Sequence, residues 1–275
     1  MCELFAISSK IATSVSFSLH EFSQHGGKTG VHADGWGLAT YEGRTAHVYR
    51  ETEPAAFSRR MKFIQAHPVK THCVISHIRL ATIGQKALRN TQPFVRQLGG
   101  RSHVFAHNGN LPGIEEMASS DGCIVEGETD SERAFCYLFS SLKPIWLAGT
   151  PALGDRTAVI RRVFTELAEL GIANFLYSDG DYLYAFSDKR TRENGSIEPP
   201  GMYFLQRHCQ YDDESLKTAG VDIDCRPQQV CLFASVPLTD ENWQPLKQYE
   251  LVVARGGNLV DLSGSDLPAG EGMGA

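Results

Sequence analysis

Apolar residues alternate with polar or small residues along many short stretches of this chain, a spacing typical of β-strands. Residues 35–51 predict a hairpin that turns at Glu42-Gly43, and residues 174–188 predict a second that turns at Asp179-Gly180. Further strands are expected at residues 3–8, 72–82, 103–109, 201–205, 229–238 and 249–262. The chain is therefore rich in strands at both ends.

Three segments instead carry the spacing of amphipathic helices. Residues 55–66 place apolar side chains at helical intervals and stop before His67-Pro68, and residues 131–142 and 157–171 do the same further along. Strands that flank central helices predict one α+β domain over residues 2–262, with helices packed on sheet faces. Residues 263–275 are rich in glycine, and we expect this tail to be disordered.

Composition narrows the function classes. The chain has 275 residues, of which 42% are hydrophobic and 21% charged, so it can bury a large core. A net charge of −6 and no run of Lys or Arg argue against nucleic acid as a partner. No apolar stretch approaches the roughly 18 residues of a membrane span, and no export signal is visible. We therefore expect a cytoplasmic protein with no membrane partner.

Cysteine and histidine usage gives no sign of a metal site. The chain has seven cysteines and no Cys-x-x-Cys pair, so we expect neither a zinc site nor a disulfide framework. We expect three cysteines in apolar runs to be buried small hydrophobic residues: Cys73, Cys136 and Cys231. Three histidines are interpreted as hydrogen-bonded structural residues: His77, His103 and His107. We expect no metal and no cofactor.

Four polar stretches interrupt the strand and helix patterns: HADGWG (32–37), SHIRLAT (76–82), AHNGNL (106–111) and GETDSE (127–132). Each has an ordinary structural interpretation. Asn108-Gly109 could form a turn, and Thr129 or Asp130 could cap a helix. Arg79 could face water on an edge strand. These alternatives stay open when each stretch is considered alone.

Taken together with Cys2, the four stretches suggest one chemistry. A thiol can attack a carbonyl carbon, and an Asn amide with a Gly N–H can hold the oxyanion that forms. An arginine can bind a carboxylate in bidentate fashion, and an aspartate can pair with an ammonium. A substrate with a carboxylate, an ammonium and an acyl carbon is an amino acid with a side-chain amide, and glutamine fits.

These residues resemble the class II glutamine amidotransferases, which are N-terminal-nucleophile (Ntn) hydrolases, and the stand-alone members above all. The motifs MC, DGWG, HIRLAT, NTQPF, AHNGNL and GETDSE occur in the family's order within roughly residues 2–140. The resemblance implies Cys2 as the nucleophile once Met1 is removed, and Arg79 with Thr82 as ligands of the glutamine α-carboxylate. It also implies Asp130 as the ligand of the α-ammonium, and Asn108 and Gly109 as the oxyanion hole.

The same resemblance implies a four-layer αββα sandwich of two antiparallel sheets. The chain departs from the amino-sugar-forming members, which have Trp and His where this chain has Leu80 and Ile83. Those members also have Arg-Gly-Tyr-Asp where this chain has His32-Ala33-Asp34-Gly35. Those members carry a fused synthase domain. This sequence shows no motif for binding a phosphosugar or ATP that would indicate such a domain. An ammonia-accepting synthase would therefore be a separate chain.

Three functions follow from this resemblance. The first is a glutaminase that hydrolyses L-glutamine through a Cys2 γ-glutamyl thioester and releases ammonia. The second is a γ-glutamyl hydrolase acting on a peptide or thiol conjugate, and the third is a non-catalytic glutamine-binding regulatory subunit. Removal of Met1 separates the enzymes from the third, because only a free α-amine on Cys2, with a pKa of about 7.7–8.0, can take the thiol proton.

Overall fold

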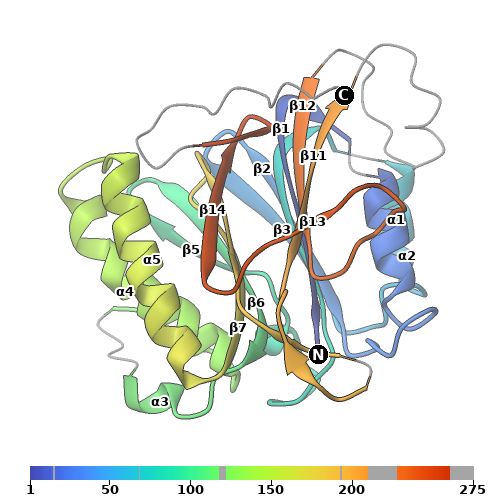
Figure 1. The fold of residues 1–275 in the computed structure, drawn as a ribbon, viewed down its shortest axis with the longest axis horizontal. Helices are drawn as coiled ribbons and strands as arrows, with labels where there is room; N and C mark the ends of the chain where they lie inside the picture. The colour runs from blue at the N-terminus through green and yellow to red at the C-terminus, as the bar shows by residue number, and fades with distance from the viewer. Residues whose placement is uncertain (15, 68, 118–121, 193, 210–227, 261–275) are drawn as a thin grey trace, which may run out of the picture.

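The computed structural model describes residues 1–275 except 15, 68, 118–121, 193, 210–227 and 261–275. The tail predicted at residues 263–275 therefore lies outside the described residues. Two large antiparallel sheets form the centre of the described chain (Figure 1). Both sheets contribute residues to the candidate site.

The first sheet has seven strands in the order β13-β11-β12-β1-β4-β2-β3. Its strands, in chain order, are β1 (Glu3–Thr13), β2 (Trp36–Glu42), β3 (Thr45–Glu51), β4 (Thr71–Ile78), β11 (Tyr203–Cys209), β12 (Gln228–Ala234) and β13 (Gln244–Pro245). Strand β1 lies near the centre, paired with β12 on one side and β4 on the other. The residue before β1 is Cys2, so the predicted nucleophile enters the fold beside two central strands.

The second sheet has six strands in the order β15-β14-β8-β7-β6-β5. Its strands are β5 (Phe94–Leu98), β6 (Arg101–Asn110), β7 (Ile172–Ser178), β8 (Leu183–Ser187), β14 (Glu250–Arg255) and β15 (Asn258–Leu259). A separate two-stranded ribbon joins β9 (Arg190–Thr191) to β10 (Ile197–Glu198). Strand β6 is paired on both sides, and it carries the Asn108-Gly109 pair.

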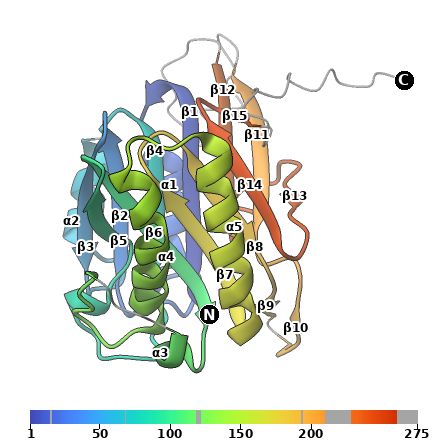
Figure 2. The ribbon, with the colours of Figure 1, turned by 90° about the vertical axis from the view of Figure 1, so that its left-hand side faces the viewer.

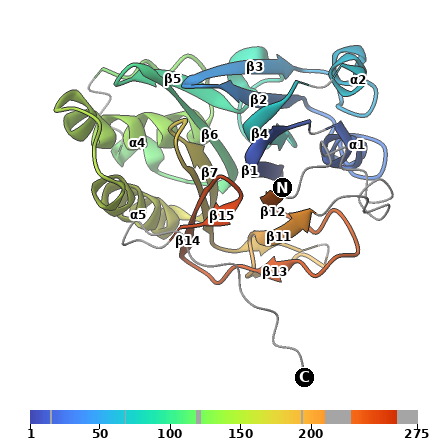
Figure 3. The same ribbon diagram turned by 90° about the horizontal axis from the view of Figure 1, so that it is seen from above.

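Helices cover the outer face of each sheet, which makes four layers in the order αββα (Figure 3). Helices α1 (Ser16–Gln24) and α2 (Arg59–Ala66) lie on the seven-stranded sheet. The long helices α4 (Asp130–Leu147) and α5 (Leu153–Leu170) cover the six-stranded sheet (Figure 2). Two short helices, α3 (Ile114–Met117) and η1 (Leu88–Asn90), connect longer elements. The predicted α+β sandwich is confirmed.

The alternation along β1 shows how sequence produces these layers. Phe5 and Ile7 belong to the core cluster beneath α1 and α2, whereas Leu4 and Ala6 belong to the cluster between the two sheets. Successive side chains of a strand point to opposite faces, so one strand serves both cores. The layer between the sheets uses small residues at several positions, which lets the sheets pack closely: Ala6, Ala39, Ala106, Ala185 and Ala254.

Both predicted hairpins and the two long helices are present, but some elements differ from their predictions. Helix α2 begins at Arg59 and not at residue 55, because the Ser58 side chain accepts a hydrogen bond from Met61 N and caps the helix there. Helix α1 and strand β5 were not predicted. Among the described residues, no helix is both long and apolar enough to cross a membrane.

The cysteine prediction needs one correction. Cys136 is buried, as expected, but it forms a disulfide with Cys123, with the two Cα atoms 5.4 Å apart. Cys136 lies on α4, and Cys123 lies in the segment that leads into that helix. The folding of this segment back onto α4 brings the two thiols together, and no Cys spacing in the sequence indicated it. Cys73 and Cys231 are free, Cys231 fully buried and Cys73 partly.

Candidate active site

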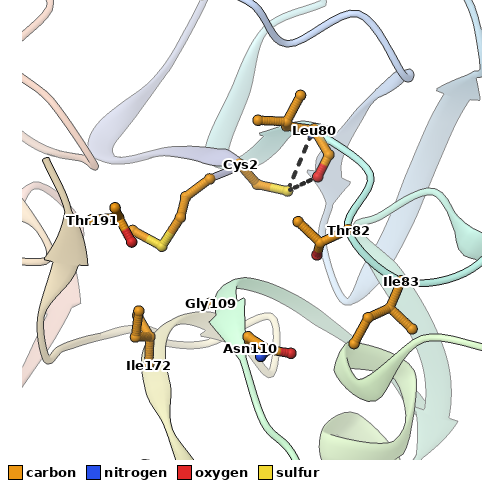
Figure 4. Close-up of a pocket in the computed structure, with 9 residues that line it drawn as sticks. Cys2, Leu80, Thr82, Ile83, Gly109, Asn110, Ile172 and Thr191 are labelled. Atoms are coloured by element: carbon orange, nitrogen blue, oxygen red, sulfur yellow. Dashed lines mark hydrogen bonds between the residues drawn. The ribbon is translucent and has the colours of Figure 1, made fainter. Parts of the chain in front are cut away.

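Cys2 lies against the backbone just after β4. Its Sγ accepts a hydrogen bond from Leu80 N at 3.3 Å and lies 3.4 Å from Leu80 O as a donor (Figure 4). Burial raises the pKa of the Cys2 thiol, which the Leu80 contact and the nearby positive charge of Arg79 only partly oppose. With Met1 attached, the thiol is therefore the favoured form, and a nucleophilic thiolate would need a base.

Five of the six predicted site residues line one small cavity of about 20 Å³: Cys2, Arg79, Thr82, Gly109 and Asp130. They come from the ends of β1 and β4, from β6 and from the start of α4. A second cavity of about 360 Å³ also borders Cys2 and is partly apolar, with Leu80, Ile83 and Ile172 in its lining (Figure 4). Cys2 thus borders both a small polar recess and a wider space.

Arg79 follows β4, which lies between β1 and β2, and its side chain is only 3% exposed. The interpretation of Arg79 as a water-facing edge residue is therefore wrong. Its guanidinium donates to the carbonyl oxygens of Ile83, Gly84 and Gln85, at 3.0, 3.0 and 3.1 Å. These bonds use three of its five N–H donors. The loop 83–85 consequently covers the guanidinium.

The same loop is tied to the segment that precedes α4. Asn90 Nδ2 donates to Gln85 O at 2.9 Å, and Asn90 Oδ1 accepts from Glu128 N at 2.9 Å. Arg89 pairs with the Glu128 carboxylate at 2.6 Å. A Cβ on Gly127 would lie 2.3 Å from Asn90 Oδ1, so a glycine is needed for this close approach. These contacts connect the loop 83–85, which covers Arg79, to the start of α4, where Asp130 lies.

Asn108 and Gly109 do not form a turn, because both lie within β6 and pair with Asn174 and Ala173 of β7. A Cβ at Gly109 would lie 1.8 Å from Ile172 O, so only glycine fits there. Asn108 is fully buried but is not part of the lining of either cavity at Cys2. Its Nδ2 donates to Ser235 Oγ at 3.2 Å, and its Oδ1 has no hydrogen-bond partner among the described residues.

Two neighbouring residues at the start of α4 have different roles: Thr129 caps the helix, and the Asp130 carboxylate accepts backbone hydrogen bonds beside the small cavity. Thr129 Oγ1 accepts a hydrogen bond from Glu132 N at 3.3 Å, so the helix cap is Thr129. Asp130 instead accepts from Leu111 N at 2.9 Å and from Ser131 N at 2.8 Å, and it lines the small cavity. A carboxylate at a helix N-terminus is favoured by the helix dipole.

The three histidines differ in their partners. His103 is hydrogen-bonded to Tyr177 Oη and Leu98 O, and His107 to Ser131 Oγ and Ile172 O, as predicted. The prediction that His77 is hydrogen-bonded is wrong, because neither of its ring nitrogens has a partner among the described residues. Burial lowers the pKa of His77 to about 3, helped by Arg79, so the ring is neutral.

Two residues that the sequence analysis left without a role hold the site together. Gln92 Oε1 accepts from His107 N at 2.6 Å and its Nε2 donates to His107 O at 3.1 Å, which fixes the backbone just before Asn108. Asp34 Oδ2 accepts from Ala81 N at 2.9 Å, next to Thr82. Gln92 lies in the motif NTQPF and Asp34 in the motif DGWG. Their place in these family motifs was the sequence feature that could have indicated a role at the site.

Comparison with known proteins identifies the family. The family model described as "Glutamine amidotransferases class-II" matches residues 1–271. The chain belongs to the class II glutamine amidotransferases. The "Putative glutamine amidotransferase YafJ" of Escherichia coli strain K12 is 35% identical over 255 residues, covering 90% of this chain and 94% of the relative.

Two solved structures have a similar fold. One is the "predicted glutamine amidotransferase from Pseudomonas aeruginosa PA01", with a TM-score of 0.67 and 31% identity, covering 94% of this chain and all of that one. The glutamine phosphoribosylpyrophosphate amidotransferase of B. subtilis has a TM-score of 0.61 at 18% identity, over 94% of this chain and 48% of its own. The second likeness concerns the fold alone.

Proposed function

We propose that this class II amidotransferase hydrolyses the side-chain amide of L-glutamine through Cys2, after removal of Met1, and releases ammonia. The observation that carries the proposal is the shared lining of one recess by a thiol, a guanidinium, a carboxylate and a glycine backbone. In this proposal Arg79 and Thr82 bind the substrate α-carboxylate, and Asp130 binds the α-ammonium. A separate synthase chain would take the ammonia.

The chemistry starts with the freed α-amine of Cys2, which takes the proton of the adjacent thiol. The sulfur then attacks the amide carbon, and the oxyanion forms near Gly109 N–H and the Asn108 amide. The Cys2 ammonium gives its proton to the amide nitrogen, the C–N bond breaks and ammonia leaves. Water then hydrolyses the γ-glutamyl thioester to glutamate and the free thiol. The raised pKa of the Cys2 thiol supports this sequence of steps, because a buried thiol needs such an internal base.

Substrate entry requires a rearrangement of the loop 83–85. The recess of about 20 Å³ has room for roughly one water molecule, and three donors of Arg79 are occupied by that loop. A carboxylate is a stronger acceptor for a guanidinium than a backbone carbonyl. Binding of the glutamyl group would therefore replace the carbonyls of residues 83–85 and open the recess.

A second candidate function keeps the glutamyl recess and changes the leaving group. The cavity of about 360 Å³ beside Cys2 is far larger than ammonia needs, and Leu80, Ile83 and Ile172 give it an apolar lining. This favours hydrolysis of a γ-glutamyl peptide or thiol conjugate whose amine portion fills that cavity. The third candidate, a regulatory subunit that binds glutamine without turnover, would be favoured by a retained Met1.

One experiment separates the three. Intact mass establishes whether Met1 is absent, and the processed protein is then incubated with glutamine, glutathione and other γ-glutamyl compounds. Glutamate and the released ammonia or amine are measured, with Cys2→Ala as the control. Turnover of glutamine alone supports the glutaminase, and turnover of conjugates alone supports the γ-glutamyl hydrolase. Equal product from Cys2→Ala would contradict both enzymes.

A further inference from the structure

His32 contacts the peptide group that joins Met1 to Cys2. Its Nε2 lies 2.6 Å from Met1 O, and its side chain is buried. Met1 O and Cys2 N are bonded to the same carbon, so Cys2 N lies within about 5 Å of Nε2. When Met1 is removed, its carbonyl goes with it, and the new α-amine of Cys2 is the polar group left at this place.

The other side of the His32 ring is fixed by a close backbone approach. Nδ1 lies 3.3 Å from His25 O. A Cβ on Gly30 would lie 2.6 Å from His25 O and 3.0 Å from His32 Nδ1, so a side chain at residue 30 would force the two groups apart. The His25 ring is itself held by Glu3 Oε2 at 2.7 Å. The His32 ring is thus anchored on β1 through His25 and Glu3.

The two contacts of the ring have a consequence for its protons. A carbonyl oxygen only accepts hydrogen bonds, so with Met1 attached both ring nitrogens of His32 would have to donate, which only an imidazolium can do. With Met1 removed, a neutral ring suffices. Nδ1–H donates to His25 O, and the lone pair of Nε2 is available to the amine. This tautomer follows from the acceptor at Nδ1.

We propose that His32 is the positioning residue of the catalytic α-amine: its Nε2 accepts a hydrogen bond from the Cys2 ammonium. This inference rests on the proposed function. In the step concerned, the S–H bond of Cys2 breaks and an N–H bond forms on its own amine, while the electron pair stays on sulfur. His32 stabilises the resulting ammonium–thiolate pair and keeps the amine directed at the thiol.

The test compares His32→Ala and His32→Gln with the wild type, with Met1 removal verified by intact mass in each. For His32→Ala we expect kcat to fall about 10- to 100-fold, the usual value of a hydrogen bond to a charged group. The KM should stay within about threefold, because the glutamyl ligands are unchanged. His32→Gln, whose amide oxygen can accept the same bond, should recover most of the loss.

Alkylation of Cys2 at a fixed neutral pH gives a readout that needs no substrate. His32→Ala should slow it by a factor similar to the fall in kcat, since less thiolate is present. Burial raises the pKa of the Cys73 and Cys231 thiols to about 12, so both should alkylate slowly. Cys2→Ala measures the background from all the other cysteines. His47→Ala is the matched control, as His47 is an exposed histidine on β3 that pairs with Glu42.

The outcomes separate the two proposals. Unchanged kcat and alkylation in His32→Ala would overturn the role of His32 while leaving an active wild type, and hence the proposed function, intact. A fall in kcat that His32→Gln does not recover, or one matched by a rise in KM, would also overturn it, since general damage to the site has that pattern. A processed wild type without hydrolase activity would defeat the proposed function, and alkylation would still test His32.

Discussion

At the scale of single residues, the proposed site combines groups that stabilise the transition state with groups that bind the substrate. Asn108 is proposed to act on the transition state alone, so Asn108→Ala should lower kcat about 10²–10³-fold with little change in KM. The measurement is steady-state release of glutamate and ammonia from glutamine. Asn242→Ala, an exposed asparagine outside the site, is the control. Near-normal turnover in Asn108→Ala would remove this residue from the oxyanion hole.

Arg79 is proposed to bind the ground state as well as the transition state. Arg79→Lys keeps the charge but loses the planar fork, so the KM for glutamine should rise about 10- to 100-fold. The substitution also removes donors to the loop 83–85. Arg59→Lys, on the exposed surface of α2, should leave the KM unchanged. Saturation kinetics of Arg79→Lys equal to the wild type would exclude the carboxylate contact.

At the scale of elements, strong periodicity made most of the fold predictable. The hairpins β2–β3 and β7–β8 and the helices α4 and α5 follow from alternation, turn glycines and apolar spacing. Strand β5 has five residues, of which only two are fully buried, and α1 has a largely polar sequence, so neither stood out. Periodicity detects only elements that bury one continuous face.

Pairing between elements was not predictable from such patterns. Residues 2, 79, 109 and 130 meet because β1 pairs with β4 in one sheet, while β6 in the other sheet lies beside the start of α4. The family motifs indicated the residues but not the loop 83–85 over Arg79. Nor did they indicate that the Asn108 side chain would donate to Ser235, which follows β12 of the other sheet. These features depend on contacts between distant segments, which a single sequence does not record.

Gly109 shows how an element and a site constrain each other. Gly109→Ala would place a Cβ 1.8 Å from Ile172 O, so β6 and β7 must separate locally. We expect the free energy of unfolding to fall by about 1–3 kcal/mol, measured by urea denaturation, together with loss of activity. Gly154→Ala on α5 is the matched control, because nothing lies within 4 Å of its Cβ. It should be neutral or stabilising by up to about 1 kcal/mol. Equal stabilities would contradict the close approach at Gly109.

At the scale of the whole molecule, the αββα sandwich keeps several histidines away from water and therefore uncharged. Burial lowers the pKa of His77 to about 3 and that of His103 to about 4, whereas both titrate near 6.5 in the unfolded chain. Between about pH 6.5 and pH 4 the unfolded chain binds more protons than the native one. The free energy of unfolding should therefore fall as the pH falls, by up to about 1.4 kcal/mol per pH unit for each histidine.

The opposite sign applies at His25, whose pKa is raised by its hydrogen bond to Glu3. Its stabilisation is complete below pH 6.5 and is lost only as the pH rises through the raised pKa, so it cannot mask the acid effect. His103→Gln should make the pH dependence between 6.5 and 4 shallower by about 1.4 kcal/mol per unit, measured by urea denaturation at a series of pH values. His47→Gln, at an exposed ring, is the control substitution. Parallel curves for His103→Gln and the wild type would mean that His103 is already protonated in the folded sandwich at these pH values, which the burial of its ring opposes.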